Sequence, residues 1–273
     1  MLIDTHAHVN FNVYKDDTDE VIRRSLENGV WVINVGSQYN TSKRAVEMAE
    51  KYEKGIYTAV ALHPIHLGPS KFVDKEEVGP FLKFKTREEE FDKEKYKKLA
   101  LNPRVVAIGE TGLDYYYIDE DEKIKELQKK VFKQHLELAK ELNKPIIFHC
   151  RKAYNDLLYE IQNTKYEIRG VLHCFMGKKG QAQQFLDMGF YLGFNGLTTY
   201  CRDYDTVIKS TPLEKILIET DCPYLTPEPH RGKRNEPLYV KYVAEKIAEI
   251  KQIPFSRVAS QTTKNAKKLF NLV

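Results

Sequence analysis

Residues 145–175, PIIFHCRKAYNDLLYEIQNTKYEIRGVLHCF, contain the pattern that decides the fold. Two short apolar runs, at 145–150 and 170–175, enclose a segment with helical spacing of apolar residues. Continuous apolar runs of this length are typical of strands buried on both faces, and parallel strands are joined through a helix. The stretch therefore predicts a strand–helix–strand unit of a parallel sheet.

The same alternation extends along the whole chain. Apolar runs predict eight strands, at 1–5, 30–36, 57–62, 105–110, 145–150, 170–175, 191–196 and 215–221. Helical spacing recurs between them, most clearly over 122–142. By their capping preferences, Thr18 and Ser42 are expected to begin the first two helices. Gly29 and Gly55 are expected to end these helices.

Eight alternations favour an α/β fold of the (β/α)₈ class, a TIM barrel, and an open doubly wound sheet is the alternative. The 273 residues contain no Pro/Gly/Ser-rich linker, so we expect a single domain over residues 1–273. The charged segment 71–99 is longer than the other connections. A surface loop followed by the third helix is expected there.

The composition limits the class of protein. Apolar residues make up 42% of the chain and charged residues 30%, which suits a folded protein and argues against disorder. No apolar run approaches the ~18 residues of a membrane span. The net charge of +4 is small for this length, so charge alone gives little support for nucleic-acid binding.

Polar side chains of metal-binding types stand at the carboxyl ends of the predicted strands. They are His6, His8, His63, Glu110, His149, His173, Asn195 and Asp221. In a parallel barrel these ends converge on one face, so residues from different strands can surround one small volume. His6 and His8 are two residues apart and should point to the same side of their strand, with Asp4 on that side one layer deeper.

The cysteines and the first residues bear on location. The four cysteines, Cys150, Cys174, Cys201 and Cys222, are far apart and form no CxxC pair. Three of them directly follow a polar residue at a strand end, so they should face the helices as buried side chains. The start MLIDTHAHVN lacks the basic and apolar parts of a secretory signal. We expect a cytoplasmic protein, or a nuclear one in a eukaryote, with a monomer favoured and no membrane partner.

The polar set indicates a metal centre. Four histidines and two carboxylates without a thiolate suit Mg²⁺, Mn²⁺ or Zn²⁺, and six ligands are more than one tetrahedral site uses. Two divalent ions that share a bridging carboxylate are the expected number. Such a pair can lower the pKa of a bound water and stabilise both oxygens of a phosphoryl displacement. Asp221 is placed to bind one ion and accept the proton of the water.

Five segments, LIDTHAHVN, VAIGETGLDYY, PIIFHCRKA, VLHCFMG and ILIETDCPYLTP, resemble the successive signatures of the TatD family of metal-dependent deoxyribonucleases, within the amidohydrolase-like superfamily. A single HxH pair is a weak signal, but five segments in order at the spacing of barrel strands are specific. The resemblance covers nearly the whole chain.

The resemblance implies a ligand set. One ion would be held by His6, His8, Glu110 and Asp221, and a second by Glu110, His149 and His173. Glu110 would be the bridging carboxylate, and Glu110 and Asp221 would be the catalytic residues. Mg²⁺ is the first expectation for both ions, with Mn²⁺ and Zn²⁺ as alternatives.

The resemblance also implies contacts with substrate. His63 and Arg151 match positions near the scissile phosphate, where a donor or a cation would neutralise developing charge. The loop 226–237 is basic and could follow a phosphodiester backbone through Arg231 and Asn235. Tyr115 begins a run of three tyrosines that could stack on unpaired bases of a single-stranded or frayed DNA end.

The expected function is hydrolysis of DNA phosphodiester bonds by a metal-bound hydroxide, as a 3′→5′ exonuclease. One alternative is hydrolysis of a small amide, lactone or ester by the same centre, because amidohydrolases share the barrel and the HxH pattern. An alternative of another class is a non-catalytic nucleic-acid-binding barrel. The presence of every predicted ligand argues against that alternative.

Overall fold

The structure is a computed structural model, and it describes residues 1–69, 86–116, 118 and 121–273. Its strands are β1 Leu2–Ala7, β2 Val30–Val35, β3 Ile56–Val60, β4 Val105–Asp114, β5 Ile146–Arg151, β6 Gly170–Leu172, β7 Tyr191–Phe194 and β8 Ile216–Ile218. Each strand pairs in parallel with the next one along the chain. The order from β1 to β8 follows the sequence, which excludes an open doubly wound sheet.

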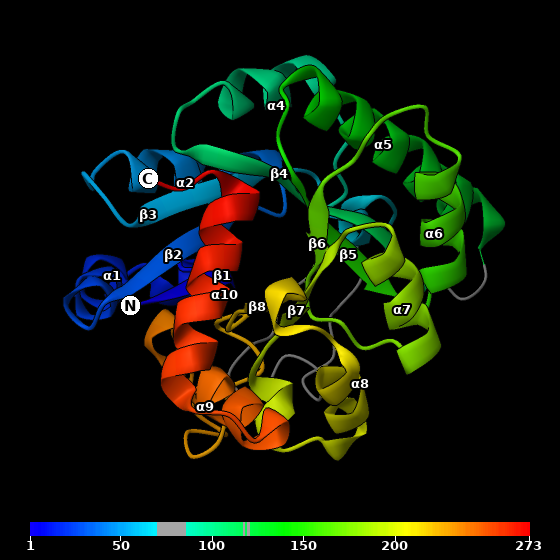
Figure 1. The fold of residues 1–273 in the computed structure, drawn as a ribbon. Coiled ribbons are helices and arrows are strands. Elements are labelled where there is room, and N and C mark those ends of the chain that lie inside the picture. The colour runs from blue at the N-terminus through cyan, green and yellow to red at the C-terminus, as the bar shows by residue number, and fades with distance from the viewer. Residues whose placement is uncertain (70–85, 117, 119–120) are drawn as a thin grey trace.

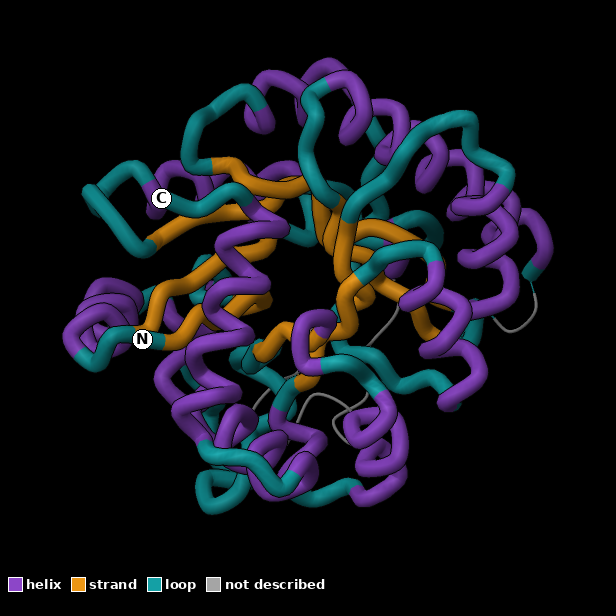
Figure 2. Tube along the Cα trace, in the orientation of Figure 1, coloured by secondary structure: helices purple, strands orange, loops and turns teal. Residues whose placement is uncertain are grey.

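The sheet closes through the segment that follows β8. Ala7 of β1 forms a parallel bridge with Cys222. The His8 backbone N–H donates to the Cys222 carbonyl at 2.8 Å, and the Asp221 N–H donates to the His6 carbonyl at 2.8 Å. Figures 1 and 2 show strands around a central axis with helices outside them. The predicted (β/α)₈ TIM barrel is confirmed.

Helices fill the connections between the strands. They are α1 Thr18–Glu27, α2 Tyr39–Ala49, α4 Lys93–Ala100, α5 Glu122–Glu141, α6 Tyr154–Gln162, α7 Lys179–Asp187, α8 Asp205–Ser210, α9 Val240–Lys251 and α10 Phe255–Phe270. Helix α5 matches the prediction for 122–142. Most of the predicted surface loop at the start of 71–99 lies outside the described residues, and α4 is the helix expected at its end.

Of the two expected helix starts, the one at Thr18 is right and the one at Ser42 is wrong. Thr18 is the first helical residue of α1, and its hydroxyl donates to a carbonyl of the preceding turn instead of capping the helix. Helix α2 begins before Ser42, because the hydroxyl of Thr41 accepts hydrogen bonds from the Ser37 and Gln38 backbone at its first turn. It also ends at Ala49, well before Gly55.

Strands β6, β7 and β8 are among those that end earlier than the apolar pattern predicts. The expected strands continue through the polar residues that follow β6, β7 and β8, but the structure ends them at Leu172, Phe194 and Ile218. Cys174 (φ 43°) and Asp221 (φ 55°) then adopt left-handed backbone conformations, which do not continue a strand. The chain therefore turns where the polar side chains are presented.

The inside of the barrel is apolar at the end where the strands begin. Side chains such as Ile33, Ile147 and Leu217 form a buried cluster with Leu269 and Phe270 of α10. Helix α10 lies across this end of the barrel, at the front of Figure 1. The Thr263 hydroxyl donates to the Met1 carbonyl at 3.1 Å, and further bonds from α10 reach the start of β8. A larger apolar cluster packs the outer faces of the strands against the helices.

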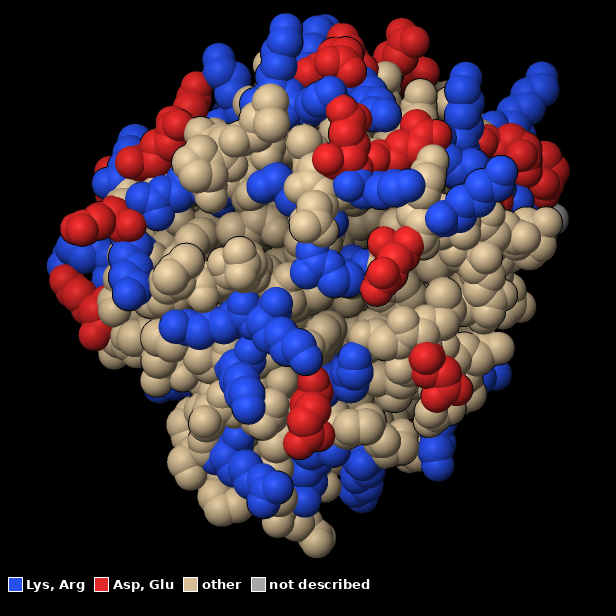
Figure 3. Space-filling view, turned by 45° about the horizontal axis from the view of Figure 1, so that its top comes forward, with Lys and Arg blue, Asp and Glu red and all other residues tan. Residues whose placement is uncertain are grey.

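The outer surface mixes charges of both signs. Over the helices at the top of Figure 3, Lys and Arg side chains alternate with Asp and Glu. Ion pairs between α4 and α5 include Lys93 with Glu137 at 3.5 Å and with Glu141 at 3.6 Å. Among the described residues, no helix has both the length and the apolar character that a bilayer crossing requires.

Candidate metal centre

The six predicted ligands converge at the end of the barrel where the strands finish. On one side, the Nε2 atoms of His6 and His8 lie 3.2 Å apart. Asp221 Oδ1 lies 3.7 Å from His6 Nε2 and 3.4 Å from His8 Nε2. Glu110 Oε2 lies 3.3 Å from His6 Nε2 and 4.0 Å from His8 Nε2. These four side chains surround one point.

The other oxygen of Glu110 faces a second group. Oε1 lies 2.6 Å from His149 Nδ1 and 2.6 Å from His173 Nε2. His63 Nε2 approaches the same oxygen at 3.3 Å. Glu110 thus stands between two sets of imidazoles, with one carboxylate oxygen toward each set.

Irregular strand register places two of these ligands. Between Asp4 and Ala7 the pairing of β1 with β2 shifts, so the alternation of sides is broken there. Ile3 faces the barrel interior, whereas the Asp4 carboxylate accepts hydrogen bonds from the Thr220 N–H and hydroxyl. The prediction that Asp4 shares the side of His6 is therefore wrong. A second shift, between Gly109 and Thr111, lies at Glu110.

His149 and His173 of the second group each have a further buried carboxylate behind the ring. His149 Nε2 lies 3.0 Å from Asp114 Oδ2. His173 Nδ1 lies 3.4 Å from Glu219 Oε1, which also accepts a hydrogen bond from the Cys174 N–H at 2.6 Å. Gly193 leaves room for Glu219, because a Cβ there would lie 2.4 Å from Oε2 of that carboxylate. In the first group, His8 Nδ1 contacts the Val35 carbonyl at 2.8 Å.

The electrostatics of the cluster are strongly coupled. Burial opposes ionisation of Glu110, but the imidazoles of His173, His63 and His6 outweigh it and hold the pKa of Glu110 well below its ordinary value. Burial also disfavours the charged form of His173, yet Glu110 and Glu219 raise its pKa well above the ordinary value. Burial and the charge of His173 lower the pKa of His6. Acidic and basic groups in the cluster thus compensate one another.

The donor set fits divalent cations. Three groups of three side chains have ligand atoms within 4.8 Å of one another: His6 with His173 and Asp221, His6 with His8 and Glu110, and His63 with Glu110 and His149. Imidazole nitrogens and carboxylate oxygens without a thiolate suit Zn²⁺, Mn²⁺ and Mg²⁺. An ion would replace ring protons here, because only a neutral imidazole nitrogen can ligate.

Two predicted substrate contacts lie beside the cluster. His63 is buried, and its Nε2 points at Glu110 while its Nδ1 accepts a hydrogen bond from the Ile65 N–H at 3.0 Å. Arg151 is two residues after His149 on β5, so it points to the same side of the strand. The Arg151 guanidinium lies 3.9 Å from the centroid of the Tyr116 ring.

In the loop that begins at Tyr115, the exposed aromatic ring is Tyr116 and not the expected Tyr115. Tyr115 packs against the apolar core, and its hydroxyl donates to Asp156 Oδ2 at 2.9 Å. Tyr116 is 39% exposed and also has the Lys152 amino group 4.5 Å from its ring centroid. The accessible aromatic ring among the described residues of this loop is therefore Tyr116, because the side chain of Tyr115 is used in packing. Tyr117 lies outside the described residues.

The basic loop divides into exposed and structural residues. Arg231 is exposed, and its guanidinium lies 4.2 Å from the centroid of Tyr200. Arg234 forms an ion pair with Asp17. Asn235 is fully buried, and its amide donates to the Thr220 and Tyr224 carbonyls. These bonds hold the loop to the strand end, and substrate binding by Asn235 stays a prediction.

Some features of the site were missed or misjudged from sequence. Asp114, in the quoted segment VAIGETGLDYY, touches His149 and was not predicted; its position four residues after Glu110 was the available signal. Cys150 and Cys222 are buried as expected, but Cys174 is half-buried, because the turn after β6 breaks the alternation of sides. Asn195 caps a short 3₁₀ helix, Gly196–Thr199, through its side-chain oxygen.

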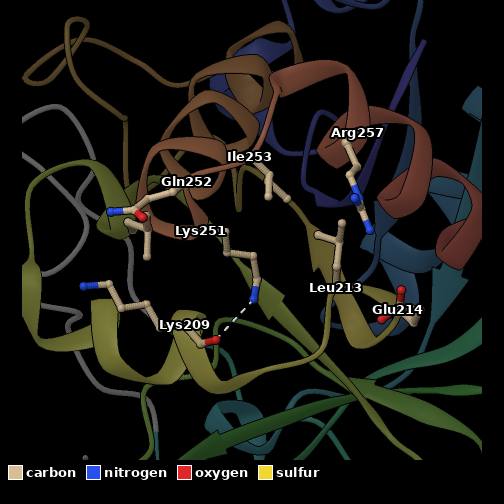
Figure 4. Close-up of a pocket in the computed structure, with 8 residues that line it drawn as sticks. Lys209, Leu213, Glu214, Lys251, Gln252, Ile253 and Arg257 are labelled. Carbon is tan, nitrogen blue, oxygen red and sulfur yellow. Dashed lines mark hydrogen bonds between the residues drawn. The ribbon is translucent and has the colours of Figure 1, made fainter.

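A separate pocket lies far from this centre. Figure 4 shows it between the end of α8, the end of α9 and the start of α10, which is the end of the barrel where strands begin. Lys209, Lys251 and Arg257 contribute to its lining. The Lys251 amino group donates to the Thr211 carbonyl at 2.7 Å and to the Lys209 carbonyl at 3.4 Å. These bonds join α9 to the chain after α8, so we assign them to stability.

Known proteins resemble this chain over its whole length. The chain is 43% identical to the uncharacterized metal-dependent hydrolase YabD of Bacillus subtilis, with 100% of both chains covered. It is 32% identical to the uncharacterized metal-dependent hydrolase YcfH of Escherichia coli, with 99% of this chain and 96% of that protein covered. The crystal structure of YjjV, a TatD homolog of Escherichia coli, has a TM-score of 0.85 and 27% identity, covering 100% of this chain and 98% of that one.

The family described as TatD related DNase matches residues 3–271. That span contains all six predicted ligands, both register shifts and the closure of the barrel. With these relatives, the match identifies the chain as a metal-dependent hydrolase that belongs to the TatD family.

Proposed function

We propose that this hydrolase cleaves phosphodiester bonds of DNA. The observation that carries the proposal is the contact of two cations with an exposed aromatic ring beside the cluster. Arg151 and Lys152 lie two and three residues after His149, and both contact the ring of Tyr116. Cations that neutralise a phosphate beside a ring that stacks on a base are the chemistry of single-strand binding. A small neutral amide or lactone has no phosphate and no base, so it would need neither the cations nor the aromatic ring.

Two divalent ions are proposed as the cofactor. His6, His8 and Asp221 would hold one ion, and His149 and His173 the other, with Glu110 between them. The two Glu110 oxygens face different sets of imidazoles, which supports a bridging role. When bound, such ions would acidify a water and stabilise the entering and leaving oxygens of the phosphoryl group. The imidazoles make Zn²⁺ and Mn²⁺ as suitable as Mg²⁺.

Asp221 is the proposed proton acceptor. Burial raises the pKa of its carboxyl, but the bond to His8 and the charges of His6 and His173 outweigh burial and keep the pKa below its ordinary value. An ionised carboxylate at the centre can take a proton from the attacking water. Arg151 would bind a non-bridging phosphate oxygen through its guanidinium. His63, with a ring N–H toward the centre, would donate to the same phosphate.

The test is digestion of a 5′-labelled single-stranded oligonucleotide, with Mg²⁺, Mn²⁺ or Zn²⁺ and with EDTA. A ladder that shortens from the 3′ end is expected, and a 3′-terminal phosphorothioate should block it. Glu110→Gln should lower the rate by roughly 10³-fold or more, because both ions lose a ligand and each contributes several kcal/mol. Glu249→Gln, an exposed acid on α9, is the matched control and should retain the wild-type rate.

Other outcomes separate the alternatives. Internal cleavage of the oligonucleotide with the 3′-terminal phosphorothioate would indicate that the protein is an endonuclease and not an exonuclease. Faster cleavage of an RNA of the same sequence would change the substrate class. Intact nucleic acid with all three metals, together with turnover of a lactone, amide or ester panel, would overturn the proposal in favour of a small-molecule hydrolase.

A further inference from the structure

We propose that Asp114 is a positioning residue of the metal centre, which keeps the ring proton of His149 on Nε2 and so leaves Nδ1 as a lone-pair donor. This inference rests on the proposed ligand role of His149. Its basis is a difference between the groups that lie behind two neighbouring histidines, His149 and His63, whose ring centroids are 4.2 Å apart.

An acceptor lies behind His149. Its Nδ1 is 2.6 Å from Glu110 Oε1, and its Nε2 is 3.0 Å from Asp114 Oδ2. A carboxylate can only accept a hydrogen bond when ionised, so Nε2 must carry the proton of that bond. By the same rule Nδ1 carries a proton toward Glu110 as long as no ion is bound. An ion at the centre would replace that proton and meet the Nδ1 lone pair, because the remaining ring proton is held by Asp114.

A donor lies behind His63. The Ile65 backbone N–H donates to His63 Nδ1 at 3.0 Å, which requires a lone pair on Nδ1. The ring proton of His63 is therefore on Nε2, the nitrogen that faces Glu110 Oε1 at 3.3 Å. Although both imidazoles approach the same oxygen, His149 can offer a lone pair to an ion at the centre, whereas His63 can offer only an N–H. The contacts assign His149 as a ligand and His63 as a hydrogen-bond donor.

Asp114 is itself held in place. It is 3% exposed, and its Oδ1 accepts a hydrogen bond from the Tyr116 N–H at 2.9 Å. Its backbone N–H donates to Gln128 Oε1 at 2.8 Å, and the Gln128 amide donates to the Asp114 carbonyl at 3.0 Å. Helix α5 thus fixes Asp114 through the buried Gln128. A carboxylate fixed behind a ligating imidazole sets the ring orientation and increases the basicity of the other nitrogen.

The first measurement is Zn²⁺ binding to the full chain by isothermal titration calorimetry after removal of metal with a chelator. Asp114→Asn should raise the Kd of one of the two ions by about 10–100-fold, the effect typical of partners behind metal ligands. His149→Ala should abolish the binding of the same ion. Asp156→Asn is the matched control, because Asp156 lies on α6 and accepts a hydrogen bond from the Tyr115 hydroxyl. It should leave both Kd values unchanged. An unchanged Kd in folded Asp114→Asn would overturn the proposal.

The second measurement is ¹⁵N NMR of the histidine rings in the Zn²⁺-loaded wild-type protein, and it needs no Asp114 variant that folds. Signals of His149 and His63 are assigned by their loss in His149→Gln and His63→Gln. Both rings are expected to carry their proton on Nε2, with the shift of a metal-bound nitrogen at Nδ1 of His149 only. A proton on His149 Nδ1, or a metal-bound nitrogen in His63, would overturn the proposal. Neither measurement uses DNA, so absence of nuclease activity would overturn the proposed function alone.

Discussion

At the end of the barrel where the strands begin, the interior is filled by apolar side chains and covered by α10. At the end where they finish, the interior contains imidazoles and carboxylates that contact one another directly. Apolar packing at the first end stabilises the fold, whereas burial of charged groups at the second end costs free energy, which opposite charges within the cluster or a bound ion must offset. The comparison indicates that stability and chemistry occupy different layers of one barrel.

The largest expected effect tests the apolar layer. Phe270 of α10 is 2% exposed within the cluster that closes the barrel. Phe270→Ala should lower the free energy of unfolding by about 3–5 kcal/mol, through lost burial and the cavity left behind. Denaturant unfolding in EDTA measures the change. Leu101→Ala, at a side chain that is 64% exposed, is the control and should have little effect.

The next effect tests whether the two layers are independent. A ligand at about 100 times its Kd stabilises a folded protein by roughly 2.7 kcal/mol. Zn²⁺ at that excess should therefore raise the free energy of unfolding of the wild-type protein and of Phe270→Ala by the same amount, because distant sites add. Unfolding of both proteins with and without Zn²⁺ gives the two increments. A smaller increment in Phe270→Ala would show that α10 is coupled to the metal centre.

A third prediction concerns pH and a histidine outside both layers. Burial lowers the pKa of His135 to about 3, while its Nε2 accepts a hydrogen bond from the Leu62 N–H. Between pH 6.5 and 3 the unfolded chain binds a proton at this residue and the folded chain does not, so stability falls as pH falls by about 1.4 kcal/mol per unit. The stability advantage of wild type over His135→Gln should shrink accordingly between pH 6 and 4.5. A constant difference would contradict the assignment.

The smallest expected effect lies at the rim of the polar layer. If Tyr116 stacks on a base, Tyr116→Ala should raise KM for single-stranded DNA by roughly 5- to 150-fold, since one stacked base contributes about 1–3 kcal/mol. The kcat and the Zn²⁺ affinity should not change. Tyr159→Ala, at an exposed tyrosine of α6, is the control. An equal KM in the two variants would remove Tyr116 from the substrate site.

The sequence predicted the barrel and the convergence of the six candidate ligands because both depend on regular features. Apolar runs and their helical connections determine the order of parallel strands, and residues at the strand ends must converge once the barrel closes. The position of Asp4 could not be predicted, because a register shift reverses the side of a strand and leaves no mark in the apolar pattern.

Contacts made by loops also could not be predicted from the sequence. Arg231, Arg234 and Asn235 belong to one basic stretch, yet one is exposed, one pairs with Asp17 and one is buried. They differ in which part of the chain, remote in sequence, lies next to them in space. For Asn235 this neighbour is Thr220, whose carbonyl accepts a hydrogen bond from the Asn235 amide. The role of Asp114 depends in the same way on the pairing of β4 with β5, which brings it to His149.

Both chain ends lie at the barrel end covered by α10, where Met1 is 55% exposed and Val273 is 88% exposed. The hydroxyl of Tyr57, near the start of β3, donates to the Val273 carbonyl. The candidate metal centre is at the opposite end of the barrel. A fusion partner or a surface anchor attached to either terminus would therefore leave the mouth of the barrel facing solution. Immobilised on a bead or a sensor chip through such an anchor, the enzyme should remain open to long polymers.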